Sequence, residues 1–157
     1  MICKLFKILF SLDEKEKKVK ERKTDATIRK FTTHVNVSKV TTGNGLEKAF
    51  RRLRKNPWTL VQRADYKNNV PDFLVSNEYG EFAYVECKYY GALKDKLWVD
   101  VVRAYVKKQP KQWEAFKKLS DYAPVYFFTV ARKDITADKP KARLIKIDSK
   151  GVLTLIV

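Results

Sequence analysis

Two apolar-rich runs in the middle of the chain predict a β-hairpin. The first covers residues 70–76 and the second residues 82–89, and Asn-Glu-Tyr-Gly at 77–80 supplies turn residues between them. Successive side chains of a strand point to opposite faces of its sheet. We therefore expect Glu86 and Lys88 to share one face of the second strand.

Three more segments have the pattern of strands. Residues 58–63 alternate along the chain, and the nearly continuous apolar run at 124–131 predicts a central strand that is covered on both faces. Residues 143–147 and 152–157, joined by a Ser-Lys-Gly turn, predict a hairpin at the end of the sheet.

Residues 46–55 have the pattern of an amphipathic helix. The apolar positions follow the i, i+3, i+4, i+7 spacing: Leu46, Ala49, Phe50 and Leu53. The Thr-Gly-Asn-Gly loop at 42–45 is suited to cap the start of this helix. Glu47 lies on an adjacent face, where it either pairs with Arg51 one turn later or takes a functional role. The sequence leaves these two alternatives open.

A largely helical stretch is expected at residues 97–122. Pro110 lies inside it and predicts two helices or one kinked helix. The apolar stripe of the second part consists of Ala115, Phe116, Leu119 and Tyr122. Gln112 continues this stripe one turn earlier, which directs its amide at the protein body. It is either a satisfied buried amide or a group that reaches a site on the sheet.

The first 42 residues differ in pattern from the rest. Residues 2–12 have apolar side chains at helical spacing, residues 13–23 form a dense mixed-charge run, and residues 26–42 resemble a strand. We therefore expect a helical and charged extension at 1–42 and a globular unit at 43–157, which together make a single domain. Packing on the domain or on a partner chain is expected for the first helix, with attachment to a membrane surface as the weaker alternative.

Charge and composition narrow the classes of function. The chain has 34 Lys and Arg against 18 Asp and Glu, a net charge of +16, and such a field attracts polyanions such as nucleic acid. A single histidine excludes nucleases that are built on clustered histidines. Cys3 and Cys87 do not form a pattern typical of a disulfide scaffold or a zinc site, which fits an intracellular compartment. Neither a membrane span nor a signal peptide is expected.

The acidic residues of the hairpin indicate the chemistry of a candidate site. Asp72 follows Pro71 at the mouth of the first strand, close to where Glu86 and Lys88 emerge from the second. Two carboxylates suit a hard divalent cation such as Mg²⁺, and a lysine beside them can hold a phosphate or a water. The simpler alternative is a surface ion pair, which contributes little to stability. Asp65, in the polar loop before the hairpin, is a rival acidic candidate.

In the order of these elements the chain resembles the PD-(D/E)XK nuclease superfamily. The matching elements are a helix with Glu47, a strand, Pro71-Asp72 on a second strand, Glu86-Cys87-Lys88 on a third, a helix with Gln112 and an apolar strand. The match covers residues 43–132 and is greatest with archaeal Holliday-junction resolvases and their viral relatives. It implies an α+β fold with a restriction-endonuclease-like α/β core, in which helices flank a central mixed β-sheet. This chain adds an N-terminal helix.

The resemblance implies a metal-dependent DNA endonuclease, a hydrolase of phosphodiester bonds. Asp72 and Glu86 would bind Mg²⁺ or Mn²⁺, helped by the backbone carbonyl of Cys87. Lys88 would orient or activate the attacking water and offset charge on the phosphate.

The resemblance also implies two auxiliary residues. Glu47 would be an additional acid that reaches the metal directly or through water, and Gln112 would steady the site. The match at Gln112 is the weaker of the two, because Pro110 lies where the helix of the family is expected to continue.

Positive charge on the flanking helices is expected to hold the DNA backbone and to make binding dependent on salt. The residues expected to do so are Arg51, Arg52, Arg54, Lys55, Lys107, Lys108, Lys111 and, beside them, Gln112. Double-stranded DNA is the expected partner, in the cytoplasm, or in that of the host if the chain is viral. Symmetric nicking of a junction would favour a homodimer. The alternative function is a non-catalytic basic DNA-binding protein on a degenerate nuclease-like fold.

Overall fold

A computed structural model gives the fold of the chain. It describes residues 14–16, 18–19, 23–26, 28–29, 37, 40–52, 58–63, 69–77, 80–90, 98–131 and 142–156. Several sequence-based expectations lie outside the described residues: the helix at 2–12, Leu53, Arg54, Lys55 and Asp65.

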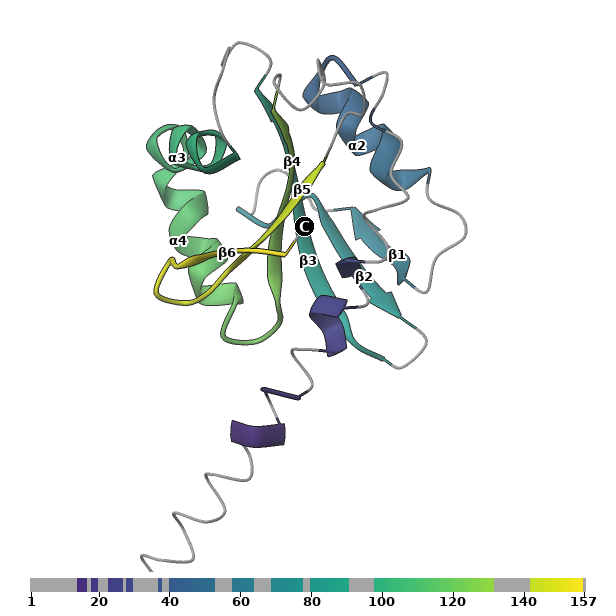
Figure 1. Cartoon of the computed structure of the whole chain (residues 1–157), viewed down its shortest axis with the longest axis vertical. Coiled ribbons are helices and arrows are strands. Elements are labelled where there is room, and N and C mark those ends of the chain that lie inside the picture. Colours follow the sequence, from purple (N-terminus) through teal and green to yellow (C-terminus); the bar gives the residue numbers. More distant parts are fainter. Residues whose placement is uncertain are drawn as a thin grey trace, which may run out of the picture.

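A six-stranded sheet forms the centre of the fold (Figure 1). Its strands lie side by side in chain order: β1 (Trp58–Arg63), β2 (Phe73–Asn77), β3 (Phe82–Tyr90), β4 (Val125–Ala131), β5 (Arg143–Ile147) and β6 (Leu153–Leu155). Neighbouring strands are antiparallel except β3 and β4, which are parallel and therefore need a long crossover between them. The sheet is mixed, as the resemblance implied.

The predicted central hairpin is confirmed. β2 and β3 are paired so that Phe73 lies opposite Val85. Gly80, which precedes β3, has a φ of 71°, in the left-handed region that glycine enters without a steric penalty. The same register, continued by one residue, places Asp72 opposite Glu86.

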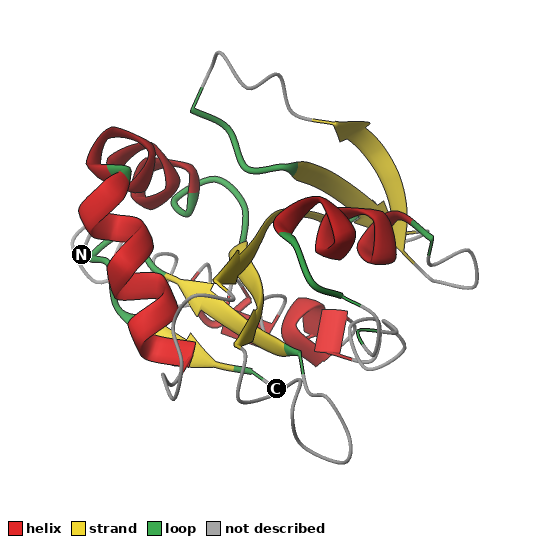
Figure 2. Cartoon of the chain, turned by 90° about the horizontal axis from the view of Figure 1, so that it is seen from above, coloured by secondary structure: helices red, strands yellow, loops and turns green. Residues whose placement is uncertain are grey.

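Helices cover both faces of this sheet (Figures 1 and 2). α2 (Gly43–Arg51) packs on one face, and α3 (Trp98–Lys108) and α4 (Pro110–Leu119) pack on the other. Thr42 caps α2 as predicted, because its Oγ1 accepts a hydrogen bond from the Gly45 N–H at 3.1 Å. Within the described ranges, no helix has the length and apolar character that would let it cross a membrane.

The predicted break at Pro110 is confirmed. α3 ends at Lys108, Gln109 precedes the next helix, and Pro110 is its first residue. A proline is well tolerated at this position, because the first N–H groups of a helix have no partner within the helix. α3 and α4 together supply the crossover between β3 and β4.

Each face of the sheet has its own apolar core. Beneath α2, buried residues such as Leu46, Phe50, Phe73, Val85 and Phe128 pack together. Beneath α3 and α4, the ring of Phe127 is surrounded by the rings of Tyr105, Trp113 and Phe116, with centroids 5.0, 6.1 and 5.8 Å away. Residues 125–130 of β4 are all buried, which confirms a central strand covered on both faces.

One predicted core position on α4 is wrong. The sequence predicts Tyr122 in the apolar stripe of this helix, but its side chain is 89% exposed. The helix ends at Leu119, so Tyr122 lies in the turn that leads to β4 and no longer follows the helical spacing. Trp113 packs against the core instead.

The predicted strand-like structure at 26–42 is also wrong where this segment is described. Residues 23–26 and 28–29 are helical. Ile28, Val37 and Val40 are buried in the core beneath α2. Their apolar side chains produced the strand-like pattern, but they fill a core without joining the sheet. These three described residues of the extension therefore share one core with the sheet.

Asp25, in the helical residues 23–26, connects the N-terminal part of the chain to the sheet. Its carboxylate accepts a hydrogen bond from the hydroxyl of Tyr126 on β4. The Nζ atom of Lys146, on β5, lies 3.1 Å from each oxygen of the same carboxylate. Because Tyr126 is fully buried, Asp25 satisfies a hydroxyl that has no access to solvent.

Replacing Asp25 with alanine is expected to lower the free energy of unfolding by about 1–3 kcal/mol, because the buried Tyr126 hydroxyl loses its acceptor. Urea denaturation followed by tryptophan fluorescence measures this loss. Adding Tyr126→Phe should restore part of it by removing the unsatisfied hydroxyl. Asp121→Ala, at an exposed carboxylate, is the matched control and should change stability by less than about 0.5 kcal/mol. Equal losses in the Asp25 and Asp121 variants would contradict the prediction.

Candidate functional site

Three residues that the sequence singled out meet at the end of the β2–β3 hairpin. The backbone N–H of Asp72 donates to Glu86 Oε2 at 3.0 Å, and the backbone N–H of Cys87 donates to Asp72 Oδ2 at 2.8 Å. Lys88 Nζ lies 2.7 Å from Glu86 Oε1. The two carboxylates thus extend the pairing of β2 and β3 by one residue, with side-chain oxygens in place of backbone carbonyls.

The Glu86 carboxylate lies inside the protein, whereas Lys88, its partner in the ion pair, reaches the surface. The Glu86 side chain is only 1% exposed, and the Lys88 side chain is 28% exposed. Phe127 of β4 is the neighbour of Glu86 in the sheet. The alternative of a surface ion pair is therefore wrong. Burying the Glu86 carboxylate removes its charge from water, and this penalty can exceed the attraction of a cation beside it.

Burial changes the acidity of Glu86. Desolvation, followed by repulsion from the Asp72 carboxylate, raises its pKa from 4.5 to about 7, although the Lys88 ammonium acts in the opposite direction. Among the described residues, Glu86 Oε1 makes no hydrogen bond of good geometry, even with Lys88 so close. This oxygen is thus a buried acceptor that the described residues satisfy only through the ion pair with Lys88.

Tyr105 and Thr129 also belong to this site, and sequence reasoning missed both. Lys88 Nζ lies over the ring of Tyr105, 5.2 Å from its centroid. Thr129 is the neighbour of Lys88 in the parallel β3–β4 pair, and its buried Oγ1 has no hydrogen-bond partner among the described residues. A threonine inside the apolar run of β4 was the available signal, but its pairing with Lys88 depends on a register that the sequence does not display.

Cys87 points to the other face of the sheet, as alternation along β3 predicted. It is 2% exposed and packs in the core beneath α2. Burial raises the pKa of its thiol well above the usual value, with smaller contributions from the charges of Asp72, Glu86 and Glu47. The thiol is therefore a protonated core group. Glu47, half-buried on α2, acts on the Cys87 thiol and so lies on the face of the sheet that Cys87 occupies.

The predicted DNA-binding residues that the structure describes lie on both sides of the sheet. Arg51 and Arg52 are exposed at the end of α2, and Lys107, Lys108 and Lys111 are exposed where α3 passes into α4. Gln112 is half-buried, one residue before Trp113, which packs on Phe127.

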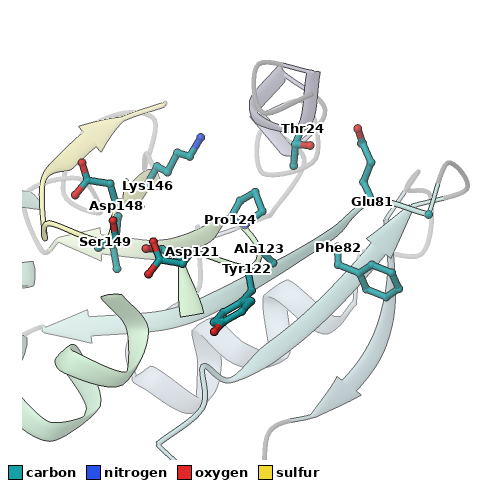
Figure 3. A pocket seen from close by; sticks show the side chains of 13 residues that line it. Thr24, Glu81, Phe82, Asp121, Tyr122, Ala123, Pro124, Lys146, Asp148 and Ser149 are labelled. Carbon is teal, nitrogen blue, oxygen red and sulfur yellow. The ribbon is translucent and has the colours of Figure 1, made fainter. Parts of the chain in front are cut away.

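A pocket of about 440 Å³ lies apart from these residues (Figure 3). Phe82, Pro124 and Lys146 are among its lining residues, with Tyr122 at its side. Phe82 begins β3, and Pro124 directly precedes β4, whereas Glu86 and Lys88 lie further along β3. The pocket is thus at the opposite end of these parallel strands, and neither Asp72 nor Glu86 lines it.

The two carboxylates suit Mg²⁺ in kind. Mg²⁺ prefers hard oxygen ligands and is commonly bound by one or two carboxylates together with waters. The buried Glu86 Oε1 is such an oxygen. In the part of the chain that the structure describes, no three side chains among His, Cys, Asp and Glu are grouped as a metal site. Asp72 and Glu86 would thus be the carboxylate ligands, with the remaining positions taken by other groups.

Comparison with known proteins identifies no relative. No protein-family model matches the chain, and no curated protein or solved structure matches it significantly. Inferences about function therefore depend on the residues and their geometry.

The raised pKa of Glu86 predicts how stability depends on pH in the metal-free protein. Because the folded state binds this proton more tightly than the unfolded state, the free energy of unfolding should fall as pH rises from about 4.5 to about 7. At about 1.4 kcal/mol per pKa unit, the contribution of Glu86 to this fall is at most about 3–4 kcal/mol. Urea denaturation at pH 5 and pH 8 in EDTA would measure it.

The Glu86→Gln variant carries no titrating group at this position, so its stability should fall less between the two pH values than that of the wild type. It should also be the more stable protein at pH 8. Asp121→Asn, at an exposed carboxyl, is the control and should keep the wild-type difference. An unchanged difference in Glu86→Gln would show that Glu86 does not titrate in this range.

Proposed function

We propose that this protein is a metal-dependent endonuclease that hydrolyses DNA phosphodiester bonds. The observation that carries this proposal is the buried Glu86 carboxylate, which accepts a hydrogen bond from the Asp72 N–H and forms an ion pair with Lys88. Such a cluster is costly to bury, and carboxyl groups with strongly shifted pKa values are frequent at active sites. The net charge of +16 supports a polyanionic substrate.

Asp72 and Glu86 would hold Mg²⁺ or Mn²⁺, helped by the backbone carbonyl of Cys87. Bound there, the metal would polarise the scissile phosphate and lower the pKa of the attacking water. Glu86 must lose its proton to bind a cation. Because its pKa is raised to about 7, the affinity for the metal should decrease as the pH drops below neutral.

Lys88 would act on the phosphate or on the water. Its ammonium lies beside Glu86 Oε1, and its partial exposure lets a substrate approach it from solvent. A positive charge at this point would offset the charge that develops on the phosphate during attack. Glu47 would serve as the auxiliary acid from the side of α2, and Gln112 would steady the site.

Double-stranded DNA is the proposed substrate. The exposed cations at the end of α2 and at the α3–α4 junction lie on both sides of the sheet and would contact phosphates on either side of the cleavage site. A homodimer would suit the symmetric nicking of a branched substrate. The lack of a three-ligand metal group among the described residues favours a second candidate, a basic DNA-binding protein without catalytic activity.

Glu86→Gln and Lys88→Met are each expected to lower DNA cleavage by about 100-fold or more, because each removes a group that acts on the reacting atoms. Nicking of a supercoiled plasmid with Mg²⁺ measures this loss, and gel shifts should show DNA binding largely unchanged. Asp121→Asn is the control and should cleave like the wild type. Full activity of Glu86→Gln, or activity that persists in EDTA, would refute the metal mechanism. A wild type that binds DNA without nicking it in Mg²⁺ or Mn²⁺ would support the second candidate.

A combined Lys107→Ala, Lys108→Ala and Lys111→Ala variant should bind DNA more weakly and with less dependence on salt. For every phosphate that the variant no longer neutralises, the slope of log K against log salt concentration should decrease in magnitude by about 0.9. Fluorescence anisotropy with a labelled duplex, from low to moderate salt, gives this slope. Lys150→Ala, in the exposed β5–β6 turn, is the control and should keep the wild-type slope. A slope in the triple variant equal to that of the wild type would show that DNA does not bind at these three lysines.

A further inference from the structure

The ring of Tyr105 faces the Lys88 ammonium. Tyr105 lies on α3 and is 1% exposed, and its ring centroid is 5.2 Å from Lys88 Nζ. This separation is within the range over which the face of an aromatic ring attracts a cation. Among the described residues, the Glu86 carboxylate and the Tyr105 ring are therefore partners of Lys88 of different kinds.

The ring is held firmly by its surroundings. It packs edge-on against Phe127, with centroids 5.0 Å apart, and is stacked with Phe116 at 6.1 Å. Both of these residues are fully buried. Close packing of this kind leaves a side chain little freedom to rotate. Tyr105 thus offers a fixed surface to a neighbour that is flexible, because a lysine carries its charge on a four-carbon chain.

The Glu86 carboxylate and the Tyr105 ring differ in how a bound cation would change their attraction for Lys88. A metal ion at Glu86 would draw electron density from the carboxylate, whose Oε1 now faces the Lys88 ammonium, and would weaken the attraction of this oxygen for the ammonium. The Tyr105 ring has no part in binding a hard cation, so its attraction for the ammonium would persist. The ring is therefore suited to keep Lys88 in place during the reaction.

We propose that Tyr105 is a positioning residue that acts through its ring to hold the Lys88 ammonium at the reacting phosphate. This inference rests on the proposed nuclease function. It differs from a role in packing alone, because it predicts that the effect of the ring on cleavage depends on Lys88. It also differs from a role of the hydroxyl, because phenylalanine should replace tyrosine.

The first experiment tests the contact without using activity. In wild-type protein, the NMR signals of the Lys88 side-chain CH₂ next to the ammonium should be shifted upfield by the ring current of Tyr105. Lys88→Met identifies these signals by their loss. The shift should remain in Tyr105→Phe and disappear in Tyr105→Leu. A wild-type spectrum without the shift, or a shift that persists in Tyr105→Leu, would overturn the proposal.

The second experiment measures cleavage of a duplex substrate. Tyr105→Leu should lower kcat by about tenfold with little change in KM, as expected for the removal of one cation–π interaction, and Tyr105→Phe should stay within about twofold of the wild type. In a Lys88→Met background, Tyr105→Leu should cause no further loss. Ile147→Ala, which truncates a buried side chain of the same core on β5, controls for packing and should retain the wild-type kcat.

These outcomes separate the inference from the function on which it rests. Equal losses in Tyr105→Phe and Tyr105→Leu, or an unchanged kcat in Tyr105→Leu, would overturn the role of the ring while the nuclease function stands. A further loss in the Lys88→Met background would assign the effect to packing. A wild type that cleaves no substrate would overturn both the nuclease function and the positioning role, even if the NMR shift confirms the contact.

Discussion

A carboxylate without access to solvent constrains the rest of the hairpin. Glu86 can remain inside the protein because the Asp72 N–H donates to one oxygen and the Lys88 ammonium faces the other. Both contacts require one register between β2 and β3, since a slip by one residue would turn Glu86 to the opposite face. The cross-strand pair of Phe73 and Val85, buried in the core beneath α2, secures this register.

Local patterns were enough to predict the parts of the site that lie on one hairpin. Alternation along β3 placed Glu86 and Lys88 on one face, and the expected hairpin brought Asp72 close to them, with its position left to the register that the structure gives. Tyr105 and Thr129 were not predictable in this way, because they reach Lys88 through a parallel strand pair joined by two helices. The helix break at Pro110 was predicted from a covalent property of proline. The errors at Tyr122 and at 26–42 arose because apolar spacing records burial and does not show where a helix ends or whether a segment joins a sheet.

The acidic residues of the site and the basic residues of the helices occupy separate places in the structure. The acidic residues Asp72 and Glu86 sit at the end of the hairpin, Glu86 fully buried, whereas lysines and arginines lie exposed on the helices of both faces. In the proposed function, this separation matters because carboxylates repel a phosphate at short range. The exposed cations would supply the long-range attraction, and a bound cation would reverse the sign of the local field.

The parallel pairing of β3 and β4 has a consequence for the order in which the protein folds. Asp72, Glu86 and Lys88 belong to a hairpin whose contacts are close in sequence, and such contacts form early at a low entropic cost. Tyr105 and Thr129 join them only after the chain has passed through α3 and α4 and closed a much longer loop. During this interval the Glu86 carboxylate would remain hydrated and acidic. Its proton affinity would then rise when β4 docks beside β3 and buries it.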